Sequence, residues 1–180
     1  MTEILLVRHG ETDWNVERRV QGHTDRPLNE TGEAQARALA DELRGERLDA
    51  VYASNLSRAR ETARAVADPL GLAVEELPAL REKHFGTWEG LLDTEIRARF
   101  PESQNGPWGD AEVMAEVSER VLDALRTIAE NHPDGRVLVV SHGGPLRAVL
   151  RSIDAGGDLP IGNCQVLRLA YENGVLRSLD

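Results

Sequence analysis

The stretch "ILLVRHGE" (Ile4–Glu11) places an apolar run directly before an arginine, a histidine and a glycine. A second stretch, "VLVVSHGG" (Val137–Gly144), repeats this arrangement and delivers another histidine, His142, followed by two glycines. Short, unbroken apolar runs are typical of strands that are buried on both faces of a parallel sheet. If the two strands are parallel neighbours, the side chains of His9 and His142 face the same crevice.

Helical and strand patterns alternate around these two stretches. The other predicted strands are Leu48–Tyr52, Val74–Leu77, Val166–Tyr171 and Val175–Leu179, the last two joined as a hairpin by Asn173-Gly174. The first predicted helix begins at a cap residue, Thr31, and ends before Gly45. The other predicted helices lie near Ser57–Ala67, Thr94–Phe100, Ala111–Glu130 and Pro145–Ile153. This order predicts an α/β three-layer sandwich, in which a mostly parallel central sheet has helices on both faces and an antiparallel C-terminal edge.

Residues 78–112 are the least regular part of the chain, with several prolines and glycines and only one short predicted helix. In open α/β sheets, ligands bind beyond the carboxyl ends of the strands. Long irregular connections frequently carry functional residues. We therefore expect this segment to form a flap over the carboxyl edge of the sheet.

The composition fits one globular domain over residues 1–180, with 41% hydrophobic and 29% charged residues. A net charge of −10 weighs against a nucleic-acid binder, which would show a basic excess. Cys164 is the single cysteine, so no intramolecular disulfide can form. The N-terminus has no basic leader, and its apolar run is too short for a signal peptide or a membrane span. These features predict a cytoplasmic protein that does not enter a membrane.

The stretch "YASNLSRARETA" (Tyr52–Ala63) places Arg58 and Arg60 near the start of a predicted helix. Cations there oppose the helix dipole, at a cost of a few tenths to about 1 kcal/mol each, and a bound anion would reverse that sign. Arg58 lies nearer to the helix start and the strand end, so we expect it to bind a ligand. We expect Arg60 to point to solvent.

The stretch "LREKHFGTWEG" (Leu80–Gly90) carries Glu82 beside Arg81, Lys83 and His84. A glutamate among basic residues is usually part of a surface ion pair. It becomes a functional candidate only if the irregular segment carries it over the crevice.

Together these residue types suit phosphoryl transfer. Two arginines and one histidine would neutralise a phosphate dianion, while a second histidine with a free ring nitrogen can attack phosphorus and form a phosphohistidine. Gly143 and Gly144 precede a helix and allow backbone N–H groups to approach an anion. Glu82 would protonate the leaving alkoxide and then deprotonate the water that hydrolyses the phosphohistidine.

Other phosphatase chemistries fit the sequence poorly. A cysteine phosphatase needs an arginine six residues after its cysteine, but the residue six positions after Cys164 is Ala170. The sequence contains no Asp-x-Asp and no G-x-x-x-x-G-K-[ST], which argues against an aspartate nucleophile and a Walker-type site. The five histidines and one cysteine show no metal-ligand spacing.

The order of the motifs resembles the histidine phosphatase superfamily, in its phosphoglycerate mutase-like branch and small bacterial phosphatase type. The resemblance covers nearly the whole chain. Its motifs are Arg8-His9-Gly10-Glu11-Thr12, Asn15, Gln21-Gly22, Asp25-Arg26-Pro27-Leu28, Ser54, Arg58-Ala59-Arg60-Glu61-Thr62-Ala63, Leu80-Arg81-Glu82, Phe85-Gly86, Trp88-Glu89-Gly90 and Ser141-His142-Gly143-Gly144.

The resemblance implies a role for each matching residue. It implies His9 as the nucleophile and Glu82 as the acid and base, with no metal and no organic cofactor. The residues implied to hold the phosphate are Arg8, Arg58 and His142, with Asn15 and the Gly143 N–H adding contacts. The residues implied at the rim are Gln21, Gly22, Thr24 and His84, for which an ordinary loop role is an equal interpretation. Glu11 and Glu89 are interpreted as structural.

We therefore predict a metal-independent phosphomonoester hydrolase that forms a phosphohistidine and acts on a small phosphorylated metabolite. A phosphoglycerate mutase is the first alternative, although mutases of this family are longer and shield the phosphoenzyme from water. The second alternative is a phospholigand-binding member without turnover. The family often has a Gly-Gly-Glu-Ser-like turn where this chain has Trp108-Gly109-Asp110-Ala111-Glu112, which leaves the natural substrate undefined. The hairpin edge could also pair with a second subunit to form a homodimer.

Overall fold

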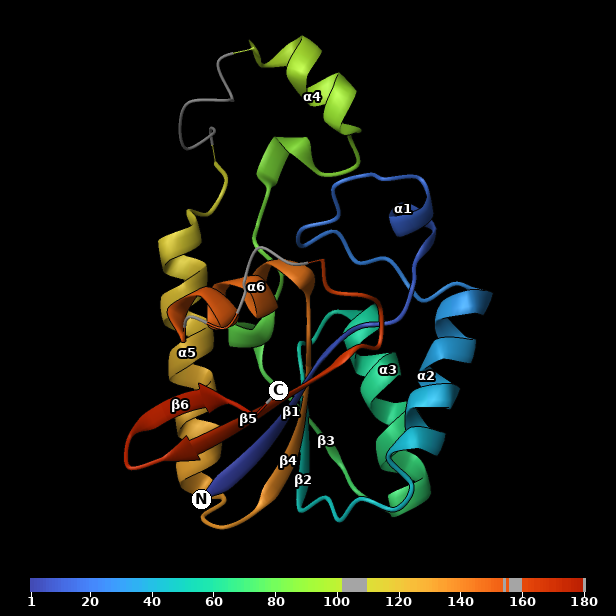
Figure 1. The fold of residues 1–180 in the computed structure, drawn as a ribbon. Helices are drawn as coiled ribbons and strands as arrows, with labels where there is room; N and C mark the ends of the chain where they lie inside the picture. The colour runs from blue at the N-terminus through green and yellow to red at the C-terminus, as the bar shows by residue number, and fades with distance from the viewer. Residues whose placement is uncertain (102–109, 154, 156–159, 180) are drawn as a thin grey trace.

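The computed structural model describes residues 1–101, 110–153, 155 and 160–179, and these form a six-stranded sheet (Figure 1). The strands lie in the order β3-β2-β4-β1-β5-β6. Their bounds are β1 Thr2–Arg8, β2 Ala50–Ala53, β3 Val74–Glu76, β4 Arg136–Ser141, β5 Val166–Glu172 and β6 Val175–Ser178. The pairs β3–β2, β2–β4 and β4–β1 are parallel, and β1–β5 and β5–β6 are antiparallel. The predicted mixed sheet with an antiparallel C-terminal edge is confirmed.

Helices cover both faces of this sheet, which confirms the three layers. Successive side chains of a strand point to opposite faces. Accordingly Leu5 and Val7 pack with α2 and α3, whereas Ile4 and Leu6 pack with α5 and α6. The helices of the two layers are α2 Glu30–Glu42, α3 Ser57–Ala67, α5 Met114–Asn131 and α6 Gly143–Ser152.

The register of the two central strands sets the level at which they end. Arg8 of β1 lies opposite Ser141 of β4. The His9 N–H donates to the Ser141 carbonyl at 3.0 Å, so the pairing continues for one residue beyond β1. His9 and His142 therefore leave the sheet at the same height and on the same edge.

The predicted limits of the first long helix were wrong at both ends. Asn29, not Thr31, is the N-cap of α2, because its side chain accepts the Gly32 N–H at 2.8 Å. The helix ends at Glu42 with Leu43 as its C-cap, so Gly45 does not stop it. Leu43 is only 1% exposed, and its burial in the core fixes where the chain turns.

The predicted bounds of other helices and strands differ from those in the structure by a few residues. The strand predicted over Leu48–Tyr52 is displaced to Ala50–Ala53, and the helix predicted from Pro145 begins two residues earlier at Gly143. Helix α5 begins at Met114 rather than Ala111. The short helix α1, Asp13–Val16, was not predicted; a reciprocal capping box between Thr12 and Asn15 holds it.

The segment after β3 rises beyond the carboxyl ends of the parallel strands (Figure 1). It contains the 3₁₀ turns η2 Pro78–Leu80 and η3 Gly86–Trp88 and the helix α4 Asp93–Arg99, whereas the turn η1 Asp68–Leu70 precedes β3. Its role as a flap stays a prediction, and Trp108 and Gly109 lie outside the described residues. Within the described ranges, no helix combines the length and the apolar character that crossing a bilayer requires.

Candidate active site

Two histidine rings meet where β1 and β4 end. The ring centroids of His9 and His142 are 5.0 Å apart. Both residues are buried, with 3% and 0% of their surface exposed respectively. The two histidines that the motifs identified thus lie side by side, as expected for parallel neighbouring strands.

The hydrogen bonding of the His9 ring defines which nitrogen is free. Nδ1 lies 2.6 Å from the Gly10 carbonyl oxygen, so Nδ1–H donates and Nε2 keeps its lone pair. Burial, and then the charge of Arg58, hold the pKa of His9 well below its usual range. The same two causes lower the pKa of His142. Both rings are therefore neutral at pH 7, the state that a nucleophilic imidazole requires.

Arg58 brings a cation into the protein interior. Its Nη1 donates to the Thr24 carbonyl at 3.1 Å and its Nη2 to the Gly22 carbonyl at 2.8 Å. The residue is 0% exposed, and its Nε has no partner among the described residues. Burial lowers the pKa of Arg58 to about 10, so the group stays charged at pH 7. A buried charge of this kind is stabilised by an anion brought close to it.

Arg8 is a second cation near the histidine pair, because its charge lowers the pKa of both His9 and His142. Its Nη1 donates to the Ile161 carbonyl at 2.6 Å, and its buried Nε has no partner within the described ranges. Burial lowers the pKa of Arg8, while the charge of Glu82 opposes that effect. We use the term anion pocket for the side chains of Arg8, His9, Arg58 and His142.

Glu82 lies near the anion pocket, because its charge acts on both Arg8 and Arg58. Its Oε1 accepts the Lys83 N–H at 2.8 Å, and its Oε2 accepts the Gly144 N–H at 3.1 Å at the start of α6. A side chain at position 144 would collide with the carboxylate, so the glycine is required for this contact. The irregular segment therefore brings the Glu82 carboxylate to the start of α6, where His142 is the N-cap.

Three rim residues make their contacts inside the protein. The carbonyls of Gly22 and Thr24 hold the guanidinium of Arg58. The Thr24 hydroxyl donates to Glu89 at 2.6 Å. Gln21 is 9% exposed, and its Oε1 accepts the Thr12 hydroxyl at 2.9 Å. Gly22 and Thr24 thus contact the anion pocket through their backbone carbonyls, whereas the hydrogen bond of Gln21 is to Thr12.

Three further predicted residues make contacts near the ends of the strands. Asn15 Oδ1 accepts the Thr12 N–H at 3.0 Å. Gly143 is the first residue of α6, where an N–H has no acceptor inside the helix. The His84 ring lies 4.9 Å from the ring of His23.

Two glutamates and one arginine were assigned no binding role. Glu89 accepts hydrogen bonds from the backbone N–H groups of His23, Thr24 and Phe85, as its structural interpretation requires. Glu11 Oε1 accepts from the Asn29 side chain at 3.0 Å. Arg60 does not simply point to solvent, because its Nη1 lies 3.4 Å from a Glu76 carboxylate oxygen.

Sequence reasoning missed two arginines near the site. Arg147 lies one helical turn after Gly143, and its Nη2 is 3.4 Å from where a Cβ on that glycine would stand. Arg120 borders the apolar stripe of α5 and contacts the backbone around Glu82. The signal for Arg147 was its spacing of one helical turn from Gly143. The signal for Arg120 was its position beside the apolar stripe that contains Val117 and Val121.

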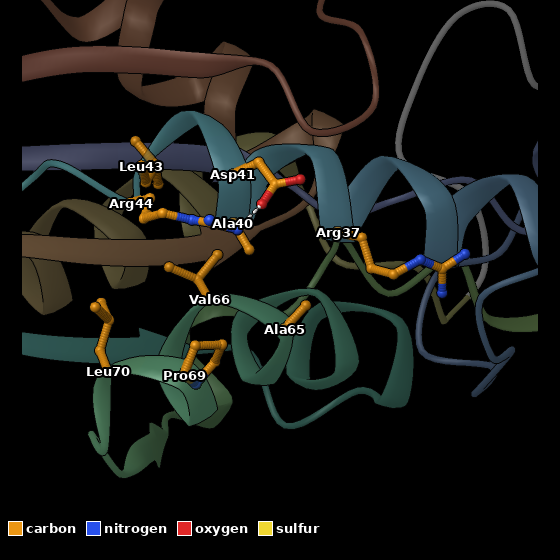
Figure 2. Close-up of a pocket in the computed structure, with 9 residues that line it drawn as sticks. All are labelled: Arg37, Ala40, Asp41, Leu43, Arg44, Ala65, Val66, Pro69 and Leu70. Carbon is orange, nitrogen blue, oxygen red and sulfur yellow. Dashed lines mark hydrogen bonds and ion pairs between the residues drawn. The ribbon is translucent and has the colours of Figure 1, made fainter.

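A separate hollow of about 290 Å³ opens between α2 and α3 (Figure 2). It lies at the far ends of these helices from Arg58 and has no histidine, cysteine or serine in its lining. Its lining residues are Arg37, Ala40, Asp41, Leu43, Arg44, Ala65, Val66, Pro69 and Leu70. Across the described residues, no three His, Cys, Asp or Glu side chains gather as a metal ion would need.

The comparisons with known proteins agree with this geometry. The profile of the histidine phosphatase superfamily (branch 1) matches residues 4–179. A metal-independent phosphoserine phosphatase from Arabidopsis thaliana is 38% identical over 99% of this chain and 81% of its own length. Phosphoglycerate mutase-like protein 4 of the same plant is 39% identical over 82% of this chain and 69% of its own length.

A solved structure is also similar. YhfR of Bacillus stearothermophilus superposes with a TM-score of 0.92 at 32% sequence identity, covering 99% of this chain and 96% of that chain. The fold expected from the order of helices and strands is therefore found in a relative of nearly the same length.

Proposed function

We propose, because this chain belongs to branch 1 of the histidine phosphatase superfamily, that His9 is the nucleophile of a phosphomonoester hydrolase. The hydrolase activity itself follows from that membership and from the phosphatase relative at 38% identity. The observation that supports this role is the neutral ring of His9, whose Nε2 keeps its lone pair close to the guanidinium groups of Arg8 and Arg58. The guanidinium groups would attract an anionic phosphate, and its phosphorus would then lie within reach of His9 Nε2.

In the first step, His9 Nε2 forms a bond to phosphorus while the bond from phosphorus to the ester oxygen breaks. Arg8, Arg58 and His142 stabilise the charge on the transferring group, as phosphoryl transfer requires. Glu82, in its protonated form, gives its proton to the departing oxygen. The products of this step are an alcohol, a phosphohistidine at His9 and the Glu82 carboxylate.

In the second step, the Glu82 carboxylate takes a proton from a water molecule whose oxygen attacks phosphorus. The bond between nitrogen and phosphorus breaks, and inorganic phosphate leaves with the neutral ring of His9 restored. Glu82 is protonated again and ready for the next cycle. Each proton is handled by a group of the protein, so hydrolysis is proposed to need no metal.

The substrate is proposed to be a small phosphorylated acid. Arg147 has no hydrogen-bond or ion-pair partner among the described residues, and its charge disfavours that of nearby Arg8. A carboxylate close to the phosphoryl group would neutralise this guanidinium. Phosphoserine, which the Arabidopsis relative's name gives as its substrate, has such a carboxylate. Arg147→Gln is expected to lower kcat/KM about 10-fold for phosphoserine and little for p-nitrophenyl phosphate.

Hydrolysis of p-nitrophenyl phosphate tests the proposed function. Turnover that persists in excess EDTA and is inhibited by vanadate, which resembles the phosphoryl transition state, is the expected result. Loss of turnover in EDTA would overturn the metal-free mechanism. A wild-type protein that binds vanadate but hydrolyses no phosphomonoester would instead be a binding member of the family.

The mutase alternative is favoured by one observation, the likeness to a phosphoglycerate mutase-like protein. Incubation with 3-phosphoglycerate separates the two activities. Release of inorganic phosphate with little isomer is the result that we expect. Rapid isomerisation with little free phosphate would assign this chain to the mutases.

A further inference from the structure

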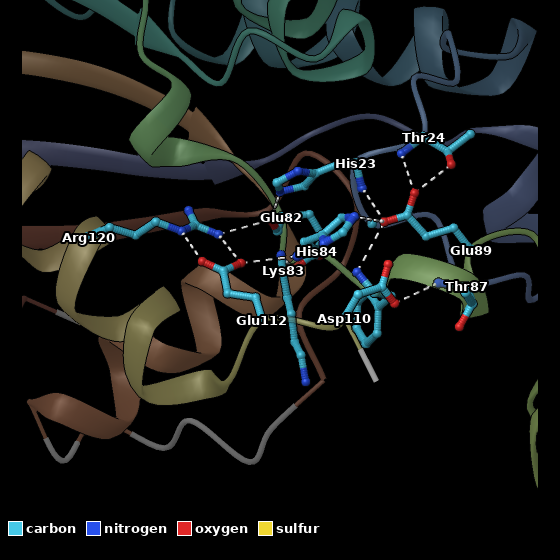
Figure 3. A network of polar contacts seen from close by, with 12 residues as sticks. His23, Thr24, Glu82, Lys83, His84, Thr87, Glu89, Asp110, Glu112 and Arg120 are labelled. Carbon is cyan, nitrogen blue, oxygen red and sulfur yellow. Dashed lines mark hydrogen bonds and ion pairs between the residues drawn. The ribbon is translucent and has the colours of Figure 1, made fainter. Parts of the chain in front are cut away.

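One arginine outside the anion pocket binds the backbone on which Glu82 stands (Figure 3). Arg120, on α5, donates from Nη1 to the carbonyls of Ala79 at 2.7 Å and Arg81 at 2.8 Å. Its Nη2 donates to the carbonyl of Glu82 at 3.0 Å. We use the term acid loop for residues 79–82.

The remaining donors of Arg120 are taken by a carboxylate. Its Nε lies 2.6 Å from Glu112 Oε1, and its Nη2 lies 2.9 Å from Glu112 Oε2. A guanidinium has about five N–H donors in a fixed plane, and the contacts to the loop and to Glu112 use all of them. Lysine has about three donors on one nitrogen and cannot reproduce this set.

The same network continues beyond the C-terminal end of the acid loop, at His84. Glu112 Oε2 accepts the His84 N–H at 3.1 Å, and the Glu112 N–H donates to the His84 carbonyl at 3.0 Å. Burial raises the pKa of Glu112, but the hydrogen bonds from Arg120 and His84 outweigh it and the pKa is lowered. Glu112 is thus held as a carboxylate that fixes the guanidinium of Arg120.

Every carbonyl of the acid loop is bound by a side chain from elsewhere. The Leu80 carbonyl accepts the Ser141 hydroxyl at 2.7 Å, and a His23 ring nitrogen lies 2.9 Å from the Glu82 carbonyl. The loop leaves the 3₁₀ turn η2 and forms no strand, so these contacts replace a sheet as its support. Arg120 supplies three of them from one planar group.

We propose that Arg120 is a positioning residue for Glu82, fixing the acid loop so that the carboxyl group meets the departing oxygen. This rests on the proposed function, since it takes Glu82 as the proton donor. A displacement of about 1 Å at a catalytic group can cost about 10²-fold in rate. Arg120 makes its hydrogen bonds to the acid loop and to Glu112. Its charge also acts on the ring of His142, and Arg120→Lys keeps that charge, so the loss in this variant reports on the position of Glu82.

Leaving-group dependence provides the test. Arg120→Lys is compared with the wild type by measuring kcat/KM, which covers the steps up to phosphohistidine formation, on p-nitrophenyl phosphate and on an alkyl phosphate. The alkyl leaving group needs a proton and nitrophenolate does not. We expect a loss of about 10- to 100-fold for the alkyl ester and less than about 3-fold for the nitrophenyl ester. Arg126→Gln, on the exposed side of the same helix beside Asp123, is the matched control and should leave both values unchanged.

A double variant distinguishes positioning from general support of the fold. In a Glu82→Gln background, Arg120→Lys should cause little further loss, because the acid is already absent. Equal losses on both esters, or a full multiplicative loss in the Glu82→Gln background, would overturn the assignment. If Arg120→Lys does not fold, Glu112→Gln gives the same comparison, since it removes the carboxylate that fixes the guanidinium. A wild type without hydrolysis would overturn the proposed function and this inference together, whereas a uniform loss in an active enzyme overturns this inference alone.

Discussion

The anion pocket and the acid loop lie next to each other but differ in how their polar atoms are satisfied. In the pocket, the Nε atoms of Arg8 and Arg58 and both ring nitrogens of His142 are buried without a partner among the described residues. In the acid loop, every backbone carbonyl accepts a hydrogen bond from a side chain outside it.

This difference assigns a separate physical task to each region. A buried donor without an acceptor costs about 1–3 kcal/mol, so the pocket gains free energy when an anion supplies acceptors. A fully bonded loop gains nothing from a ligand and holds its carboxyl group in place beforehand. In the proposed mechanism, binding energy is thus concentrated at the phosphate, and precise positioning is concentrated at Glu82, the proposed proton donor.

The largest effect is expected from removal of the nucleophile. His9→Ala deletes the nitrogen that attacks phosphorus, and hydrolysis should fall by at least about 10⁴-fold. The fold should persist, because the ring makes one hydrogen bond, to its neighbour Gly10. Circular dichroism confirms folding, and activity within 10-fold of wild type would exclude His9 as the nucleophile.

The next effect separates the two regions by chemistry. Glu82→Gln leaves the anion pocket intact but removes the proton donor, so kcat/KM for an alkyl phosphate should fall about 10²- to 10³-fold. The loss for p-nitrophenyl phosphate should be at least about 10-fold smaller. Vanadate affinity, measured by calorimetry, should change little. The same loss for both esters would mean that Glu82 is not the acid.

The pocket should also make stability depend on pH. Because the pKa values of His9 and His142 are lowered in the folded protein, the unfolded chain binds more protons below pH 6.5. The free energy of unfolding should therefore fall as the pH decreases from 6.5 to about 5.5, by up to about 1.4 kcal/mol per pH unit for each histidine. Urea unfolding at several pH values measures this slope. A flat profile would mean that both rings bind protons as readily in the folded protein as in the unfolded chain.

The smallest effect tests whether the pocket is unsatisfied before a ligand arrives. His142→Leu replaces two unpartnered ring nitrogens by apolar atoms and should raise the free energy of unfolding by about 1 kcal/mol at pH 7. Stabilisation by vanadate should be lost at the same time. His132→Leu is the matched control, because the His132 Nε2 is hydrogen-bonded to the Tyr52 hydroxyl at 2.8 Å, and it should destabilise the protein. Destabilisation by both variants would show that the His142 ring is satisfied in solution.

The sequence was sufficient for the parts of the molecule that depend on local pattern. The apolar runs before His9 and His142 predicted parallel strands and hence the meeting of the two rings, because strand direction fixes where side chains emerge. Arg58 stood out because a cation at a helix start is electrostatically unfavourable without an anion.

The acid loop could not be derived in the same way. Arg120 is 38 residues from Glu82, and its contacts are to backbone carbonyls, which leave no trace in residue type. The N-cap of α2 was misplaced for a related reason, because both Asn29 and Thr31 are good capping residues and packing of the preceding loop decides between them. The sequence pattern therefore located the proposed nucleophile, whereas the contacts that support the proposed acid became visible only in three dimensions.

The central claim is that the phosphoryl group passes through His9, and trapping the phosphoenzyme tests it most directly. Wild-type protein is mixed with substrate, quenched in alkali where phosphohistidine survives, digested and sequenced by mass spectrometry. The account predicts a phosphoryl group on His9, and its accumulation in Glu82→Gln, which lacks the base for the second step. A phosphoryl group on another residue, or none during active hydrolysis, would contradict it.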